Sequence, residues 1–285
     1  RYCYHAARAI IENNDTRLSD EDVEELLADN PDAGTFVRET FAGLYFADGV
    51  HELIDTIRAN CDKFSGYKRD IALFALGKTC VSGKGGFGHF SSSTRYSEHM
   101  PGDTPEKFKE RLRENVARIN ALVFDNGKKC RAFRMDINDF LPEVKADIAY
   151  FDPPYAAEFS TKNYEMYYHF VEGLMTYWDG LTIRKNTKTK LFESDHRTVT
   201  KSTATPFFLT FLGNAVHIPY WIISYRDHAF PREDEMRRIV SSFGRDVRVQ
   251  AKNHLYSLAG RRGEPSRAKE LLFVCEPQEE KPYCE

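Results

Sequence analysis

The sequence predicts an α/β protein with a mainly helical insert. Residues 130–285 alternate short apolar segments with one amphipathic helix, which is typical of an open α/β sheet. Residues 20–129 show helical periodicity through most of their length. Acidic residues directly follow two of the expected strands, and open α/β sheets bind their ligands at that edge. We therefore expect residues 1–19 and 130–285 to form one domain and residues 20–129 to form an insert within it.

The composition is that of a folded and nearly neutral protein. The chain has 285 residues, a formal net charge of −3 and 13% aromatic residues, which suffice for a hydrophobic core. The sequence has no apolar run long enough to span a membrane and no signal-peptide pattern. Its six cysteines are scattered, which favours reduced thiols in a cytoplasmic protein. An anionic partner must be held by local basic patches, because the net charge does not attract it.

Helices are expected in the first 129 residues. Residues 1–14 start with arginine and have the pattern of the middle of an amphipathic helix, so we expect the protein to be incomplete at its N-terminus. Ser19 is the expected N-cap of a second helix with an acidic first turn. The clearest helix starts after Thr104, its expected N-cap, with proline in the first position, and is expected to end at residues 126–127, Asn-Gly.

Strands are expected in the rest of the chain. A short strand in residues 131–136 and a buried one in residues 148–151 each end at an acidic residue. A long apolar strand follows at residues 215–227. Residues 231–244 predict a helix with acids first and arginines later, as the helix dipole prefers. The segments VRVQAKNHLYSL and AKELLFVCEP predict two closing strands.

Asp136 and Asp152 are the two acids at these strand ends. After Asp152, Pro153 and Pro154 fix the backbone and donate no N–H, and Tyr155 offers an aromatic face. The carboxylate of Asp152 and a backbone carbonyl can accept the two N–H groups of an exocyclic amine, while the heterocycle stacks on Tyr155. This arrangement orients the amine for in-line attack on an activated methyl group. A strand-ending turn with a capping acid is the alternative for so short a motif.

The segment YFDPPY resembles the catalytic motif of the D12 class of DNA N6-adenine methyltransferases. Further segments resemble that family in the same order: YCYHAARAIIEN, GLYFADGVHELIDTIRANCDKF, FRMDINDFL, NYEMYYHFVEGL and WIISYRDHAFPREDEMRRIV. The resemblance implies a Rossmann-like class I methyltransferase sheet whose N-terminal part is incomplete. It also implies an enzyme of DNA methylation and restriction-modification that transfers a methyl group from S-adenosyl-L-methionine (AdoMet) to a flipped-out adenine in double-stranded DNA.

The family's F-x-G-x-G turn, and the acid after its second strand that binds the AdoMet ribose, are absent from the sequence. By the resemblance, the target adenine is held by Asp152, Pro153, Pro154 and Tyr155. The AdoMet adenine pocket is lined by Asp136 and Ile137. No metal is expected. The resemblance makes residues 1–19 and 130–285 the catalytic domain, and we expect the insert 20–129 to choose the target sequence.

Two further groups of residues are candidates for DNA contacts. Tyr164, Tyr167 and His169 follow the catalytic motif in an aromatic segment and are candidates for shaping the base pocket, with helical packing as the alternative. A basic segment without acids is a candidate for phosphate binding, with a solvated loop as the alternative. Its candidate residues are Arg184, Lys185 and Lys188.

Two other functions stay open at this point. The exocyclic N4 of cytosine poses the same geometric problem as N6 of adenine, and Asp152 favours adenine only mildly. A non-catalytic DNA-binding subunit of a modification system is the alternative from another class. The expected partner is double-stranded DNA. The resemblance also allows a protein partner, either a restriction endonuclease or a second subunit.

Overall fold

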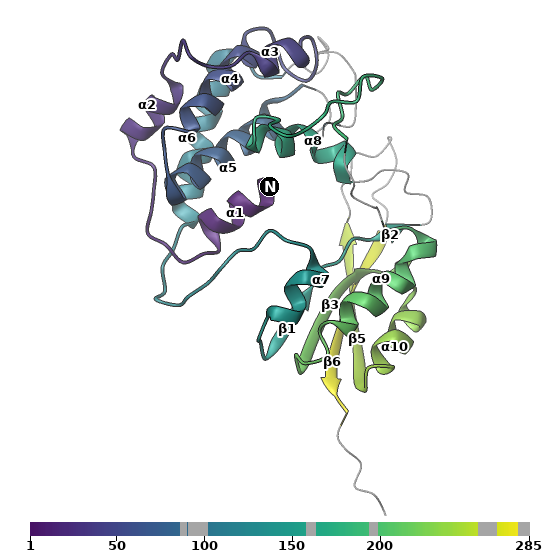
Figure 1. Cartoon of the computed structure of the whole chain (residues 1–285). Coiled ribbons are helices and arrows are strands. Elements are labelled where there is room, and N and C mark those ends of the chain that lie inside the picture. The colour runs from purple at the N-terminus through teal and green to yellow at the C-terminus, as the bar shows by residue number, and fades with distance from the viewer. Residues whose placement is uncertain (86–89, 91–101, 158–163, 194–198, 256–266, 279–285) are drawn as a thin grey trace, which may run out of the picture. The chain divides into compact units, whose positions relative to one another are not determined.

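The computed structural model describes residues 1–85, 90, 102–157, 164–193, 199–255 and 267–278. The chain divides into two compact units (Figure 1): unit 1 is Arg1–Arg134 with Asn163–Asp195, and unit 2 is Met135–Lys162 with His196–Glu285. Helices and a sheet are both present, so the predicted α/β class is confirmed. The units differ in their boundaries from the two predicted domains, whose functional roles stay a prediction. In the part of the chain described, no helix is both long and apolar enough to cross a membrane.

Unit 1 is helical. Its elements are α1 (Tyr2–Ile10), α2 (Asp20–Leu27), α3 (Phe36–Thr40), α4 (Val50–Cys61), α5 (Gly66–Gly83), α6 (Pro105–Leu122) and α8 (Tyr164–Met175). Helix α5 is central and packs against α1, α4, α6 and α8 (Figure 1). The consecutive residues Ile71, Ala72 and Leu73 point to different sides of α5 and are all fully buried. A helix that is apolar on all sides is expected to be surrounded by others.

The predicted helix starts are confirmed. Ser19 accepts a hydrogen bond from the Asp22 N–H, and the Asp22 carboxylate accepts one from the Ser19 N–H, which forms a capping box for α2. Thr104 caps α6 as predicted. The predicted end of α6 is wrong, because the helix stops at Leu122. The guanidinium of Arg17 donates to the carbonyls of residues 120 and 123, which satisfies acceptors that a helix end leaves unpaired.

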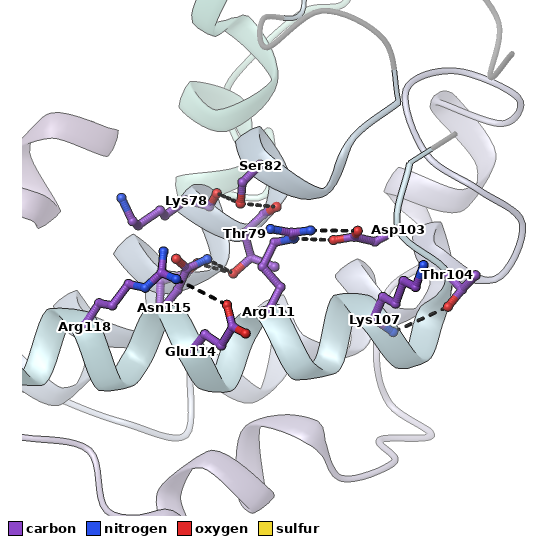
Figure 2. A network of polar contacts seen from close by, with 11 residues as sticks. Lys78, Thr79, Ser82, Asp103, Thr104, Lys107, Arg111, Glu114, Asn115 and Arg118 are labelled. Carbon is purple, nitrogen blue, oxygen red and sulfur yellow. Dashed lines mark hydrogen bonds and ion pairs between the residues drawn. The ribbon is translucent and has the colours of Figure 1, made fainter. Parts of the chain in front are cut away.

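Polar contacts join α5 to α6 (Figure 2). The Asn115 side-chain amide donates to the Thr79 hydroxyl at 2.9 Å, and both residues are buried. Arg111 binds Asp103 through two nitrogens, one of them at 2.9 Å. The Asp103 N–H also donates to the carbonyl of Gly83 at 2.7 Å. Because a buried polar group without a partner is costly, these pairs favour one arrangement of the two helices.

Unit 2 contains the sheet. Its elements are α7 (Ile137–Phe140), the 3₁₀ helix η1 (Leu141–Glu143), β1 (Ile148–Phe151), β2 (Ala156–Ala157), α9 (Lys201–Gly213), β3 (Tyr220–Arg226), β4 (Ala229–Phe230), α10 (Glu233–Ser241), β5 (Arg245–Leu255) and β6 (Arg267–Pro277). The strand order is β1-β3-β6-β5. Strands β1 and β3 are parallel, whereas β6 runs antiparallel to β3 and to β5. Strands β2 and β4 form a separate antiparallel pair.

Helices α9 and α10 cover one face of this sheet (Figure 1). Every second residue of β3 points to this face and is buried in the hydrophobic core of unit 2: Trp221, Ile223 and Tyr225. Helix α10 has the predicted acidic first turn. Helix α9 is not among the predicted elements, because its first half is rich in serine and threonine and contains Pro206, all poor helix formers.

One strand prediction is wrong and another is right only in part. Residues 131–136 contain no strand, and Asp136 is instead the N-cap of α7, where its carboxylate accepts from the Asn138 N–H at 2.8 Å. A strand needs a neighbouring ladder, and none of the described strands pairs with these residues. Strand β1 forms where predicted but is buried only in part: Phe151 belongs to the core of unit 2. Ile148 and Tyr150 are 59% and 62% exposed, because they lie on the face of the sheet opposite α9.

Candidate active site

The chain leaves the sheet directly after β1. The strand ends at Phe151, as predicted, and Asp152, Pro153 and Pro154 follow outside the ladder. Since neither proline has an N–H, the ladder has no donor with which to continue. Backbone pairing resumes at Ala156, which lies opposite Phe230 in the β2–β4 ladder. The Ala156 N–H donates to the hydroxyl of Tyr225 at 3.3 Å. The motif is therefore a short loop held at both ends.

The hydroxyl of Tyr155 lies between two carboxylates. It is 3.1 Å from Oδ1 of Asp152 and 3.0 Å from Oε1 of Glu270 on β6. The Tyr155 ring meets the Tyr225 ring edge-on, with 5.4 Å between the centroids. Burial, together with the charges of Asp152 and Glu270, raises the pKa of Tyr155 well above its ordinary value. The hydroxyl therefore keeps its proton and acts as a hydrogen-bond donor at neutral pH.

A cavity of about 250 Å³ borders the motif. Its walls come from α7, from the end of β1 with the loop after it, and from α9. The lining residues are Ile137, Tyr150, Phe151, Asp152, Pro153, Pro154, Phe207 and Phe211. An apolar cavity with aromatic walls and one carboxylate suits a flat heterocycle with a polar edge. Unit 2 thus brings Ile137 and Asp152 to one cavity, whereas Asp136 does not line it.

A larger cavity of about 610 Å³ lies in unit 1, between α1 and residues 125–133. Its polar groups bind one another. Glu12 accepts from the Ala132 N–H at 2.7 Å and from the Tyr67 hydroxyl at 2.9 Å, and Arg8 lies 3.2 Å from Asp70. The bond to Ala132 holds the segment after α6 beside the end of α1, and the contacts with Tyr67 and Asp70 join this region to α5. The cavity includes none of the residues that the sequence predicts for the site.

The predicted base-pocket residues belong to α8 in unit 1. His169 is fully buried, its Nε2 lies 3.1 Å from the carbonyl of Phe90, and burial lowers its pKa to about 4. Tyr167 is partly exposed, and its carbonyl accepts from the Phe90 N–H. Tyr164 starts α8, but its side chain lies outside the described residues. The structure gives His169 a packing role, and the role of these residues at the base stays a prediction.

The predicted phosphate-binding residues also lie in unit 1. Arg184, Lys185 and Lys188 are exposed on a turn that is closed by a bridge between Ile183 and Phe192. The Arg184 N–H donates to the carbonyl of residue 191 at 2.7 Å. The turn therefore presents three cations to solvent on a fixed backbone. Their contact with DNA stays a prediction.

Some residues around the motif are not among the sequence predictions. Glu270 lies in a predicted strand and was not identified as a site residue. The available signal was its position directly before the apolar run LLFVC, where an acid is unusual. Ser224 lies next to it on β3 and is also unpredicted. Phe207 and Phe211 belong to the unpredicted helix α9. A residue's position in strand pairing is a long-range property, so no local pattern identifies these neighbours.

Known proteins resemble the chain across this site. Residues 1–215 match the family described as D12 class N6 adenine-specific DNA methyltransferase. The type II methyltransferase M2.HphI of Haemophilus parahaemolyticus is 27% identical over 286 residues, which cover 96% of this chain and 81% of that protein. The modification methylase StsI of Streptococcus sanguinis is 31% identical over 137 residues, 47% of this chain and 20% of that protein. The chain belongs to the D12 class of N6 adenine-specific DNA methyltransferases.

Proposed function

We propose that the protein methylates N6 of adenine at a short sequence of double-stranded DNA, with AdoMet as the methyl donor and with direct transfer to the amine. The observation that carries this proposal is the end of β1, where the exposed carboxylate of Asp152 adjoins a tyrosine ring and an apolar cavity. The family match supplies the reaction and the base, and it gives no support to cytosine N4. The names of the two relatives support a role in a modification system.

Asp152 and the Pro153 carbonyl accept the two hydrogens of the target amine. A carboxylate is an acceptor only, and the two prolines bring no competing N–H to the loop. Accepting both hydrogens increases electron density on N6 and orients its lone pair. Tyr155 offers a ring face to the adenine, and its packing against Tyr225 and its hydroxyl bonds keep that face in place.

The target adenine leaves the duplex before it reaches this clamp. N6 of a stacked and paired adenine is not accessible to an in-line methyl donor, so a base-modifying enzyme extrudes the nucleotide. The exposure of Asp152 supports this step, because a flipped base requires an open acceptor edge. Arg184, Lys185 and Lys188 hold DNA phosphates, and the segment 20–129 selects the sequence.

The cavity beside the motif fits the adenine ring of AdoMet. Ile137, Phe207 and Phe211 give it apolar walls that suit a flat heterocycle. AdoMet supplies a methyl group on a positively charged sulfur when it is bound. The residues of the chain orient the acceptor, which lowers the cost of bringing the two groups in line. Asp136, at the start of α7, is the further residue that we propose for this pocket.

We also propose that the strands of unit 2 belong to a Rossmann-like sheet. The parallel pair β1 and β3, with the candidate clamp at the carboxyl end of β1, supports this. In doubly wound sheets helices cover both faces. Ile148 and Tyr150 mark the apolar, exposed face that a second helical layer would cover.

Mapping of modified bases tests the proposal. DNA from a host that expresses the protein is sequenced by a method that detects N6-methyladenine, next to DNA from the same host with an empty vector. We expect modified adenines at a single short sequence, and only with the protein present. Modified cytosine at that sequence, or adenines that match the empty-vector control, would contradict the proposal.

A further inference from the structure

Glu270 reaches the catalytic loop from a strand distant in sequence. In the β3–β6 ladder Ser224 lies opposite Leu272, so Glu270, two residues earlier on β6, points to the same face and lies diagonally next to Ser224. The Ser224 hydroxyl donates to Oε1 of Glu270 at 2.6 Å. The hydroxyl of Tyr155 lies 3.0 Å from the same oxygen. Because Ser224 is only 8% exposed, water competes little for these bonds.

The hydroxyl of Tyr155 has one hydrogen to share between two acceptors. Oδ1 of Asp152 and Oε1 of Glu270 are at nearly equal distances from it, 3.1 Å and 3.0 Å. A phenol donates only one hydrogen bond at a time. When the hydrogen points to Asp152, it occupies an acceptor position that a target amine requires. When it points to Glu270, the Asp152 carboxylate keeps all its acceptor positions.

We infer that Glu270 is a positioning residue for methyl transfer: it accepts the Tyr155 hydrogen, fixes the ring, and leaves Asp152 available to the target amine. Ser224 supports it, because its hydroxyl holds the Glu270 carboxylate in the orientation that meets Tyr155. The inference rests on the proposed function, in which Asp152 accepts a hydrogen of the amine. Glu270 lies beyond residues 1–215, the part of the chain that matches the family.

A double-mutant cycle between Glu270 and Tyr155 tests the inference. The rate of methyl transfer from radiolabelled AdoMet to DNA from a host without the protein is measured for the wild type, E270A, Y155F and the double variant. Y155F keeps the ring and removes the hydroxyl. A hydrogen bond to a charged group contributes enough that we expect each single variant to be about tenfold slower. The double variant should be no slower than the slower single variant, because both substitutions remove the same hydrogen bond between Tyr155 and Glu270.

Two further variants separate positioning from general structure. E270Q keeps an oxygen that accepts from both hydroxyls, so we expect its rate to stay within about threefold of the wild type. E276A is the matched control, because Glu276 lies on the same strand and face, is partly exposed and pairs with Arg248. We expect E276A to have the wild-type rate.

The outcomes distinguish this inference from the proposed function. An E270A rate equal to that of the wild type, or the same fold loss in the presence and absence of Y155F, overturns the positioning role. A wild-type rate for D152A overturns the proposed function instead. Circular dichroism shows whether E270A folds. If it does not, S224A replaces it in the cycle. A loss of rate that disappears in the Y155F background then supports the inference, and an equal loss in both backgrounds overturns it.

Discussion

Asp152 and Tyr155 contribute to the candidate site through different properties. Asp152 contributes acceptor oxygens at an exposed position, and Tyr155 contributes a ring that is fixed by its packing against Tyr225. Among the residues that the structure describes, the hydroxyl of Tyr155 contacts the carboxylates of Asp152 and Glu270. The ring and the hydroxyl of Tyr155 are therefore separable by substitution.

Removal of the Tyr155 ring is predicted to slow methyl transfer more than removal of its hydroxyl. Y155A loses the surface on which the adenine stacks, and such stacking contributes about 1–3 kcal/mol per base. We expect Y155A to be slower than Y155F by a further factor of about ten. Single-turnover rates with enzyme in excess over DNA measure this difference. Equal rates for the two variants would show that the ring does not stack on the base.

His169 is predicted to weaken unit 1 in acid. A histidine in the unfolded chain titrates near pH 6.5, and burial lowers the pKa of His169 to about 4. Between these two values the unfolded state binds more protons, so stability is present above pH 6.5 and is lost as the pH falls towards 4. H169Q should therefore lose less stability than the wild type between pH 7.5 and 5 in urea unfolding. H228Q changes an exposed histidine and should lose as much stability as the wild type over this range. An equally large loss in H169Q would show that His169 does not cause the pH dependence.

At the scale of elements, helix starts depend on local chemistry. Ser19 and Asp22 form two reciprocal hydrogen bonds at the start of α2. S19A removes one of them and should lower the free energy of unfolding by about 1 kcal/mol. Thermal unfolding measures the loss as a lower Tm. S82A is the control, because Ser82 is exposed near the end of α5 and, in the part of the chain that the structure describes, bonds to carbonyls of its own helix. A Tm for S19A equal to that of S82A would contradict the capping role.

Elements with local signals were predictable, and elements that depend on partners were less so. Ser19 and Thr104 mark their helices through side chains within three residues, and both predictions are confirmed. The end of β1 at Phe151 was also predictable, because two prolines stop a ladder wherever it lies. Residues 131–136 have the composition of a strand, but a strand also requires a neighbour. Glu270 reaches Tyr155 only through the register of β3 and β6, which no local pattern contains.

At the scale of the whole molecule, the chain consists of a helical unit and a sheet unit. The candidate clamp and the cavity beside it belong to unit 2, whereas the exposed cations Arg184, Lys185 and Lys188 belong to unit 1. The order of motifs along the chain predicted the family, and the match over residues 1–215 confirms it. The boundaries of the compact units were not predictable, because residues 1–19 have an apolar helical pattern that packs equally well on helices or on a sheet.

The turn at residues 183–192 is predicted to bind DNA phosphates. Replacement of Arg184, Lys185 and Lys188 by alanine should weaken DNA binding and reduce its dependence on salt, since each phosphate contact contributes about 0.9 to the slope of log K against log salt. Fluorescence anisotropy with duplex DNA at several salt concentrations measures the slope. K63A removes one exposed lysine from another segment and is the control. An unchanged slope in the triple variant would exclude these residues as phosphate ligands.

The central claim is that Asp152 holds the amine that receives the methyl group. The most direct test digests DNA to nucleosides after incubation with AdoMet and either the wild-type protein or D152A, and measures N6-methyladenine by mass. We expect the wild type to form N6-methyladenine and D152A to form it at least about 100-fold more slowly, the size of loss known for a group that acts in the transition state. Formation of N6-methyladenine by D152A at the wild-type rate would contradict the account.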